Sequence, residues 1–469
     1  MTADTRHRVM YALTDYFTTS VAWLIFNLVR FFTLDEVNDS NSLDRYLVYE
    51  MVLWGQLLIP LMMMGFYWLS GFYNKTFTKS RLEVLGATSG SVILGVLLIY
   101  FVAIIDDPIP DRFSNYVLLL ILTGLLMAFV LSGRLLITWL VMKRVAQGRL
   151  VDRVAVIGEC RHVAECIDRM SKTDCGNGLT IVAAATTDEE ASFDGVVMMN
   201  PDDIEAECDR NAISKVVLAV APGESQTVLS LVRRLYCLNR PLLLPAWSAC
   251  SMLARVKVRN VAGEPLTDLA SVNISESHRN IKRAMDVGLS ALALVVLLPV
   301  MAVVALMIKR DSNGPVFYCQ ERVGMHRKRF FIYKFRTMRV DAETSGPALS
   351  SDDDPRITRL GHFLRKYRLD ELPQFWNVLK GDMSLVGPRP EREFYEEQIL
   401  KHAPHYTLVH QVRPGLTSWG MVKYGYATSV DQMVERLAYD MIYLENISIA
   451  VDLKIMFFTV RTVLTGKGV

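Results

Sequence analysis

The chain has 469 residues, of which 51% are hydrophobic and 21% are charged, a balance that argues against a purely soluble protein and for membrane segments. The formal net charge of +2 is uninformative as a sum, so the distribution of charge along the chain has to be considered instead. The seven cysteines form no CxxC pair and no Cys/His spacing typical of zinc, which argues against a zinc module and for reduced cytosolic thiols.

The first part of the chain, residues 1–145, is predicted to form four transmembrane helices. Asp15 and Arg30 interrupt the first apolar stretch, and we expect both near the ends of a short helix. Arg134 is expected near the inner end of the fourth span, where a long side chain can reach the headgroups. The apolar stretches, each long enough to cross a bilayer as a helix, lie at roughly 9–32, 51–74, 84–105 and 116–142.

The loops between these stretches alternate in charge. The N-terminus, the second loop and the segment after the fourth stretch are basic, whereas the first and third loops are acidic. Because basic loops are retained in the cytoplasm, both ends of this block are expected there. Everything after residue 145 is therefore predicted to start in the cytoplasm.

Residues 150–270 are predicted to form a degenerate Rossmann-like domain with a structural or regulatory role. A dinucleotide fingerprint needs glycines so that the backbone can approach a pyrophosphate, but here Glu159 and Cys160 follow Gly158. We expect a scaffold without a catalytic cofactor; a regulatory nucleotide ligand is the alternative. Strands are expected at 154–157, 180–185, 215–220 and 241–246, and helices from 163 and over 225–238, in the alternation of a doubly wound parallel sheet.

A fifth apolar stretch, residues 288–308, carries basic residues on both sides and Pro299 near its centre. Both flanks prefer the cytoplasm, and a proline inside a helix removes a backbone hydrogen bond and bends the helix. These facts favour a re-entrant helix over 286–309 that enters one leaflet and returns. The alternative is a kinked span with an external C-terminus.

The region that follows is rich in arginine and aromatic residues. Lys334 and Arg336 alternate with Tyr333 and Phe335, as in a strand with one basic face. A nucleic-acid surface is one interpretation, but the neighbouring apolar stretch favours anionic headgroups or phosphorylated ligands. A solvated basic face is the other alternative.

A pair of adjacent carboxylates, Asp370 and Glu371, stands in a basic neighbourhood just before Pro373. A helix is expected over 356–367, with the acidic cluster 352–354 forming a loop and a helix N-cap rather than a metal site. A break after this helix would let the two carboxylates diverge. One could attack a phosphorus atom and the other could hold Mg²⁺ or Mn²⁺, while arginine and lysine neutralise the phosphates.

Several ordered motifs lie over roughly 280–469: Lys282-Arg283-x-x-Asp286, the apolar hairpin with Pro299, "QERVG", "YKFRTM", "DPRITRLGHFLRKYRLDELPQFWNVLKGDMSLVGPRP" and "VRPGLTSWG". In this order they resemble the bacterial sugar transferase family, the monotopic phosphoglycosyl transferases. The upstream block resembles the long form of that family, so the likeness covers the whole chain. Leu298 stands before Pro299 where many members have serine.

The resemblance implies a membrane protein of α plus α/β class, with a four-helix transmembrane block, the degenerate Rossmann-like domain, and a phosphoglycosyl transferase domain over 278–469 that contains the re-entrant hairpin. It implies transfer of sugar 1-phosphate from a UDP-sugar to undecaprenyl phosphate, with release of UMP. This would be the first membrane step of capsule, exopolysaccharide or O-antigen synthesis, at the bacterial inner membrane with the catalytic domain in the cytoplasm.

The same resemblance assigns roles to individual residues. Asp370 would be the nucleophile that forms a phosphosugar–aspartate intermediate, and Glu371, with Asp370, would bind Mg²⁺. The phosphate-binding candidates are Arg336, Arg365, Arg368 and Arg389, and the membrane-hairpin residues are Lys282, Arg283, Asp286 and Pro299.

Two other functions are weighed against this one: a membrane-bound NAD-dependent nucleotide-sugar dehydratase, which the broken glycine fingerprint disfavours, and a non-enzymatic assembly scaffold.

Residues 447–464 are expected to form an amphipathic helix in the membrane interface, with a core helix as the alternative. The lipid bilayer is an expected partner, a homodimer is possible and nucleic acid is not expected. No motif identifies the sugar.

Overall fold

The computed structural model falls into two compact units, which we describe separately. Unit 1 comprises Met1–Leu150 with Ile274–Lys282, and unit 2 comprises Val151–Asn273 with Arg283–Val469. The structure describes residues 3–33, 43–74, 81–104, 112–148, 151–172, 178–187, 192–200, 203–222, 224–235, 240–245, 266–268, 274–339, 342, 354–425 and 427–465.

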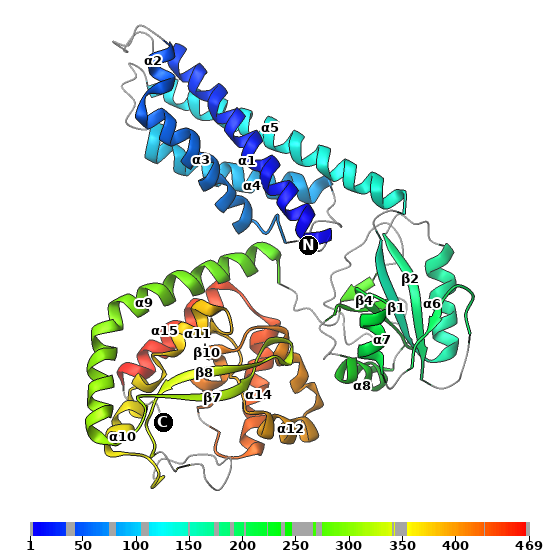
Figure 1. Ribbon diagram of the computed structural model, residues 1–469, viewed down its shortest axis with the longest axis vertical. Helices are drawn as coiled ribbons and strands as arrows, with labels where there is room; N and C mark the ends of the chain where they lie inside the picture. Colours follow the sequence, from blue (N-terminus) through cyan, green and yellow to red (C-terminus); the bar gives the residue numbers. More distant parts are fainter. Residues whose placement is uncertain are drawn as a thin grey trace. The chain divides into compact units, whose positions relative to one another are not determined.

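Unit 1 is built mainly from long apolar helices (Figure 1). They are α1 (Ala3–Thr33), the short α2 (Leu43–Val48), α3 (Glu50–Leu69), α4 (Arg81–Ile99) with the π-helical turn η1 (Tyr100–Ile104), and α5 (Arg112–Ala146). Phe26, Met63, Val96 and Leu126 from four of these helices are fully or almost fully buried in one common core. Among the described residues, five helices are long and apolar enough to cross a membrane: α1, α3, α4 with η1, α5 and α9 (Glu276–Asp311). The prediction of a membrane protein is confirmed in this coarse form.

The structure corrects two predictions about charges in unit 1. Asp15 lies well inside α1, not near a helix end, and Arg134 does not reach towards the surface from α5. Both side chains are completely buried, and the guanidinium donates to both carboxylate oxygens over 2.9 and 2.7 Å. The helical sequence pattern alone could not show that the two charges face each other across the helix bundle.

The first part of unit 2 is a six-stranded sheet in the order β3-β2-β1-β4-β5-β6. Its strands are parallel except for β6, which pairs antiparallel with β5. The strands are β1 (Asp152–Gly158), β2 (Leu179–Thr186), β3 (Val197–Met198), β4 (Lys215–Ala219), β5 (Leu242–Pro245) and β6 (Leu266–Asp268). The predicted α/β architecture with a parallel sheet is therefore confirmed.

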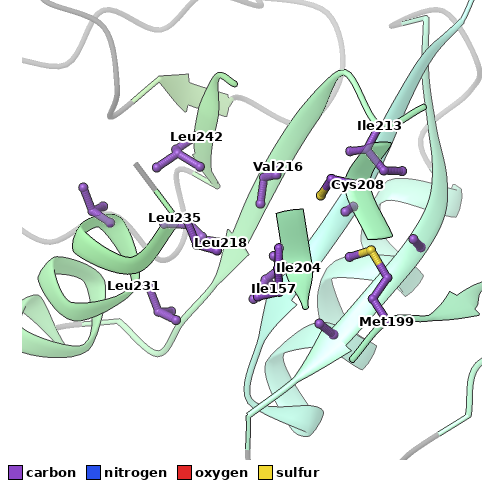
Figure 2. Close-up of a cluster of buried hydrophobic side chains, with 14 of the residues drawn as sticks. Ile157, Met199, Ile204, Cys208, Ile213, Val216, Leu218, Leu231, Leu235 and Leu242 are labelled. Carbon is purple, nitrogen blue, oxygen red and sulfur yellow. The ribbon is translucent and has the colours of Figure 1, made fainter. Parts of the chain in front are cut away.

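Apolar residues cover both faces of this sheet, as expected where helices lie on both sides. On one face, Ile157 of β1 and Leu218 of β4 belong to a core that includes Cys208 and Leu235 (Figure 2). On the other face, Val156 packs in a second cluster. The helices of this part are α6 (Cys160–Lys172), α7 (Ile204–Arg210) and α8 (Ser225–Leu235).

The second part of unit 2 begins within α9, which contains Pro299 and is drawn with a marked bend in Figure 1. The antiparallel hairpin of β7 (Phe317–Val323) and β8 (Arg329–Phe335) follows, with the turn η6 (Met325–Arg327) between its strands. The remaining elements are α10 (Arg359–Lys366), η7 (Leu369–Glu371), α11 (Gln374–Lys380), β9 (Ser384–Val386), α12 (Glu393–His402), η8 (Pro404–Gln411), β10 (Gly415–Thr417), α13 (Trp419–Lys423), α14 (Val430–Glu445) and α15 (Ile449–Leu464).

Two of the predicted hairpin residues join α9 to this part of unit 2. The guanidinium of Arg283 donates to the carbonyl oxygens of Val378 and Leu379 over 2.7 and 2.9 Å, so it caps the C-terminal end of α11. The carboxylate of Asp286 is buried and accepts a 3.0 Å hydrogen bond from the backbone N–H of Leu385 in β9. Arg283 and Asp286 therefore fasten the start of the apolar helix to the domain that follows it.

Candidate active site

The backbone around the carboxylate pair is bent at a defined place. Helix α10 begins after Thr358, whose hydroxyl accepts from the N–H of Gly361, so the acidic cluster before it does not provide the predicted N-cap. A Cβ at Gly361 would lie 2.1 Å from the carbonyl oxygen of Thr337, so only glycine lets the helix approach this closely. Arg368 then adopts a left-handed conformation with φ of 53°, which ends the helical path and starts the short turn η7. The predicted break between α10 and the carboxylates is present.

Asp370 and Glu371 lie in η7 and are both buried, with 7% and 6% of their surface exposed. Three cations surround Glu371: Lys334 lies 2.9 Å from Oε1, Arg389 lies 3.9 Å from Oε1, and Arg368 lies 3.6 Å from Oε2. Asp370, in contrast, makes no hydrogen bond or ion pair with any residue that the structure describes. The two neighbouring carboxylates therefore lie in different environments: Glu371 is surrounded by cations, whereas Asp370 is buried without a hydrogen-bond or ion-pair partner among the described residues. We call Asp370 the open carboxylate.

The pKa values of the two carboxyl groups follow this difference. Burial raises the pKa of Asp370 to about 6, against the attraction of Lys334 and with a further increase from the negative charge of Glu371. Burial would also raise the pKa of Glu371, but Lys334, Arg368 and Arg389 together outweigh it and lower that pKa to about 2. Near neutral pH Glu371 is a fixed anion, and Asp370 is ionised but poorly neutralised.

The four predicted phosphate-binding arginines have different positions. Arg368 and Arg389 lie beside Glu371, whereas the Nε of Arg365 donates to the hydroxyl of Thr337 over 3.0 Å. Arg336 lies just beyond β8, where its guanidinium donates to the backbone oxygens of Ser312 and Asn313 after the end of α9. These contacts place Arg368 and Arg389 beside Glu371 and Arg336 at the end of the apolar helix. The charge of Arg365 also acts on the dyad, because it lowers the pKa of Asp370 against the effect of burial.

Lys334 is the dyad neighbour that the sequence did not single out. It was expected only as part of a basic strand face, two residues before Arg336. In the structure its ammonium group makes the shortest ion pair of Glu371. The alternation along β8 was the available signal, but it could not tell which basic residue of the strand faces the carboxylates.

Helix α11, which follows the dyad, is pinned to β8 by one buried amide. Asn377 accepts from the N–H of Tyr333 over 3.1 Å and donates to the carbonyl of Phe331 over 2.7 Å. These bonds satisfy strand groups next to Lys334 and so tie the helix that follows the dyad to the strand that carries Lys334.

The donor set of the dyad fits a hard divalent cation that also binds substrate phosphates. Within the described ranges no cluster of three or more His, Cys, Asp or Glu residues could hold a metal ion, so the protein alone offers no closed cage. Mg²⁺ is commonly held by one or two carboxylates together with phosphate oxygens and water. The carboxylate of Asp370, and the Oε2 of Glu371, whose one contact among the described residues is Arg368 at 3.6 Å, match that requirement.

Together, fold and site define a membrane-associated protein whose α/β portion carries a buried carboxylate pair among fixed cations. The model of the family described as "Bacterial sugar transferase" matches residues 277–466. A UDP-glucose:undecaprenyl-phosphate glucose-1-phosphate transferase of Xanthomonas campestris pv. campestris is 30% identical over 400 residues, which cover 83% of this chain and 81% of the relative. The chain belongs to the bacterial sugar transferase family.

Other relatives match over a shorter region. A UDP-N-acetylgalactosamine-undecaprenyl-phosphate N-acetylgalactosaminephosphotransferase of Aeromonas hydrophila is 42% identical over 218 residues, 46% of this chain and 51% of the relative. A UDP-glucose:undecaprenyl-phosphate glucose-1-phosphate transferase of Escherichia coli K12 is 35% identical over 250 residues, 53% of this chain and 54% of the relative. The chain thus spans about half the length of these two proteins, and their printed names differ in the sugar.

Proposed function

We propose that this protein transfers sugar 1-phosphate from a nucleoside-diphosphate sugar to undecaprenyl phosphate and releases the nucleoside monophosphate. The observation that carries the proposal is the asymmetry of the dyad. Glu371 is held by three cations, whereas the neighbouring Asp370 is buried and free of hydrogen bonds from the described residues. An ionised carboxylate in that state is suited to nucleophilic attack.

In the proposed reaction, an oxygen of Asp370 attacks the phosphorus atom that bears the sugar. The bond from that phosphorus to the bridging oxygen breaks, and the nucleoside monophosphate leaves with the electron pair. An oxygen of undecaprenyl phosphate then attacks the same phosphorus and the carboxylate of Asp370 leaves. The two steps return the enzyme to its starting state without any net gain or loss of atoms.

The surrounding cations have two tasks in this scheme. Lys334, Arg368 and Arg389 keep Glu371 ionised and in place, and the two arginines can also receive phosphate oxygens of the donor. Asp370 and Glu371 would hold Mg²⁺, which would neutralise charge on the diphosphate and the leaving group when bound. A phosphate diester anion can then approach an anionic nucleophile.

The membrane arrangement is part of the same proposal. Four helices of unit 1 would span the bacterial inner membrane, and α9, bent and interrupted by Pro299, would enter one leaflet and return so that the dyad faces the cytoplasm. Helix α15 supports an interfacial position, because Asp452 and Ile455 are buried on one side. On its other side four apolar residues at helical spacing are exposed: Leu453, Phe457, Val460 and Leu464.

The donor is proposed to be a UDP-sugar. Relatives whose printed names specify UDP-glucose and UDP-N-acetylgalactosamine support this nucleotide and supply the first two sugars to examine. The pathway served would be the first membrane step of a surface polysaccharide, as the printed name "Exopolysaccharide production protein PSS" of a Rhizobium leguminosarum bv. phaseoli relative suggests.

The test uses the purified full-length chain with Mg²⁺, undecaprenyl phosphate and a panel of UDP-sugars, with UMP release as the readout. At least one donor should release UMP, and Asp370→Asn should lower that rate by at least about 1000-fold. Without acceptor, label from the sugar of the productive donor should remain on the wild-type protein and be absent from Asp370→Asn. Absence of UMP with every donor, or full activity of Asp370→Asn, would contradict the proposal.

A further inference from the structure

The segment that carries Arg389 is held in place by a second group of buried charges behind the dyad. We propose that Glu391 is a positioning residue that sets Arg389 against Glu371 through buried ionic contacts with Arg322 and Arg436. This inference rests on the proposed function for its kinetic readout, but its structural readout is independent of activity.

The backbone on both sides of Arg389 is fixed by hydrogen bonds. The carbonyl of Pro388 accepts from the N–H of Gly415 over 2.9 Å, and the carbonyl of Pro390 accepts from the guanidinium of Arg322 over 3.1 Å. The prolines themselves have no N–H group and a restricted φ. Arg389 therefore sits in a short stiff segment whose position depends on Arg322.

Arg322 in turn depends on Glu391. Its guanidinium lies 3.4 Å from one oxygen of Glu391, and Arg436 of α14 donates to the other oxygen over 2.5 Å. Glu391 and Arg436 are each only 5% exposed. Burial lowers the pKa of Arg322 to about 10, and the nearby carboxylate of Glu391 acts in the opposite direction, so Glu391 offsets part of the cost of burying this charge.

A second contact of Arg389 also depends on helix α14, which carries Arg436. The guanidinium of Arg389 lies 3.1 Å from the sulfur of Met421 in α13. The residue before Met421, Gly420, donates its N–H to Asp440 of α14 over 3.2 Å, and a Cβ there would lie 2.7 Å from the side chain of Arg436. Helix α14 thus sets both the segment that carries Arg389 and the side chain against which Arg389 packs.

In these contacts Glu391 touches Arg322 and Arg436 but neither Asp370 nor Glu371. Any effect of Glu391 on the dyad therefore passes through Arg389. Replacing its carboxylate by an amide keeps the shape of the side chain but removes the charge shared by two buried guanidinium groups. The expected consequence is a segment that no longer holds Arg389 within reach of Glu371, rather than the loss of a group that contacts substrate.

The chain offers a matched control in Glu396 of α12. Its carboxylate is even more buried, at 1% exposed, and it accepts from Arg327 over 3.0 Å and lies 3.3 Å from His410. It makes no described contact with the segment 387–390. Glu396→Gln therefore introduces the same chemical change in a buried ionic site of the same domain whose carboxylate makes no described ion pair with Arg322 or Arg436.

The kinetic experiment is a double-mutant cycle in the full-length chain. Glu391→Gln should lower kcat/KM for the donor about 10-fold or more in the wild-type background, but less than about 2-fold in the Arg389→Ala background, because the effect passes through Arg389. Glu396→Gln should change kcat/KM less than about 2-fold. Equal losses for Glu391→Gln in both backgrounds, or no loss in the wild type, would overturn the inference.

A second measurement separates this inference from the proposed function. Hydrogen exchange of the peptide over 385–395 should become faster in Glu391→Gln and stay unchanged in Glu396→Gln. If the wild type released no UMP with any donor, the proposed function would fail, but the exchange measurement would still test the positioning role. Unchanged hydrogen exchange in Glu391→Gln would overturn that role whatever the activity. If Glu391→Gln does not fold, Arg436→Lys, which keeps the charge and shortens the reach, is measured in the same way with the same expected direction.

Discussion

Buried charges occur in both units of the chain, and two carboxylates, Asp15 of unit 1 and Asp370 of unit 2, differ in whether the described residues provide them with a partner. In unit 1 the guanidinium of Arg134 donates to both oxygens of Asp15 and to the hydroxyl of Thr88, and it lies 3.7 Å from the ring centre of Phe72. In unit 2 the carboxylate of Asp370 has no hydrogen-bond partner among the described residues. Asp15 and Asp370 are thus both buried, but Asp15 has several hydrogen-bond partners and Asp370 has none among the described residues.

The difference separates a charge that holds structure from one that is available for chemistry. Tyr73 donates to Asp15 over 2.7 Å, so even the carboxylate of the unit 1 pair is fully engaged by α5 and the segment after α3. A closed pair of this kind fixes which helix faces meet. An open buried carboxylate lowers stability instead, and such a residue is commonly found where a reaction needs it.

The largest expected effect concerns the closed pair. Arg134→Leu leaves Asp15 buried without its counter-charge, so it should lower the free energy of unfolding by about 3–5 kcal/mol. Thermal unfolding of the purified chain in detergent measures this. The double variant Asp15→Leu/Arg134→Leu should recover most of the loss, because no buried charge remains; a single variant as stable as the wild type would contradict a structural role for the pair.

A smaller effect of opposite sign is expected at the open carboxylate. The folded-state pKa of Asp370 is raised from 3.8 to about 6, so wild-type stability should fall as pH rises between these values, where only the unfolded chain has lost the proton. Asp370→Asn should therefore be more stable than the wild type by about 1–3 kcal/mol at pH 7.5 with a chelator present. The gain should vanish below pH of about 4.

The neighbouring residue provides the matched control. The pKa of Glu371 is lowered to about 2, so its ionised form is stabilised in the folded protein and Glu371→Gln should reduce stability under the same conditions. Melting temperatures of the two variants across pH 4 to 8 would show whether they diverge. Parallel changes in both variants would mean that the two carboxylates are not in different environments.

The smallest effect is the acidic limb of the pH–rate profile. The proposed attack by Asp370 would require its ionised form, so kcat/KM should fall towards a tenfold decrease per pH unit below about pH 6, the raised pKa of this carboxyl group. A bound divalent cation favours the ionised form, so higher Mg²⁺ should move the limb to lower pH. A limb that does not respond to Mg²⁺ would contradict a metal held by Asp370.

Much of the secondary structure follows from local patterns. The expected strands at 154–157 and 180–185 correspond to β1 and β2, and the apolar stretches of the first part correspond to long helices. These elements are predictable because strand and helix periodicity, and the length of an apolar run, are properties of neighbouring residues. The helix before the dyad was predicted from 356 and begins at Arg359, since the cap is Thr358.

Tertiary contacts of charged residues were less predictable. The position of Arg134 depends on how α5 rotates against α1, and the pairing of Glu391 with Arg436 joins residues 45 positions apart. Lys334 and Arg336 occupy equivalent positions in the sequence alternation, yet one faces Glu371 and the other the end of α9 because β8 ends between them. No local pattern contains this information.

The pair of Asp15 and Arg134 also constrains how the protein is made. The two residues are separated by 119 positions, so α1 is synthesised long before the helix that neutralises its carboxylate. At roughly 5–20 residues per second, the ribosome needs on the order of 10 seconds to supply Arg134. During that interval the carboxylate of Asp15 lacks the counter-charge that α5 later provides.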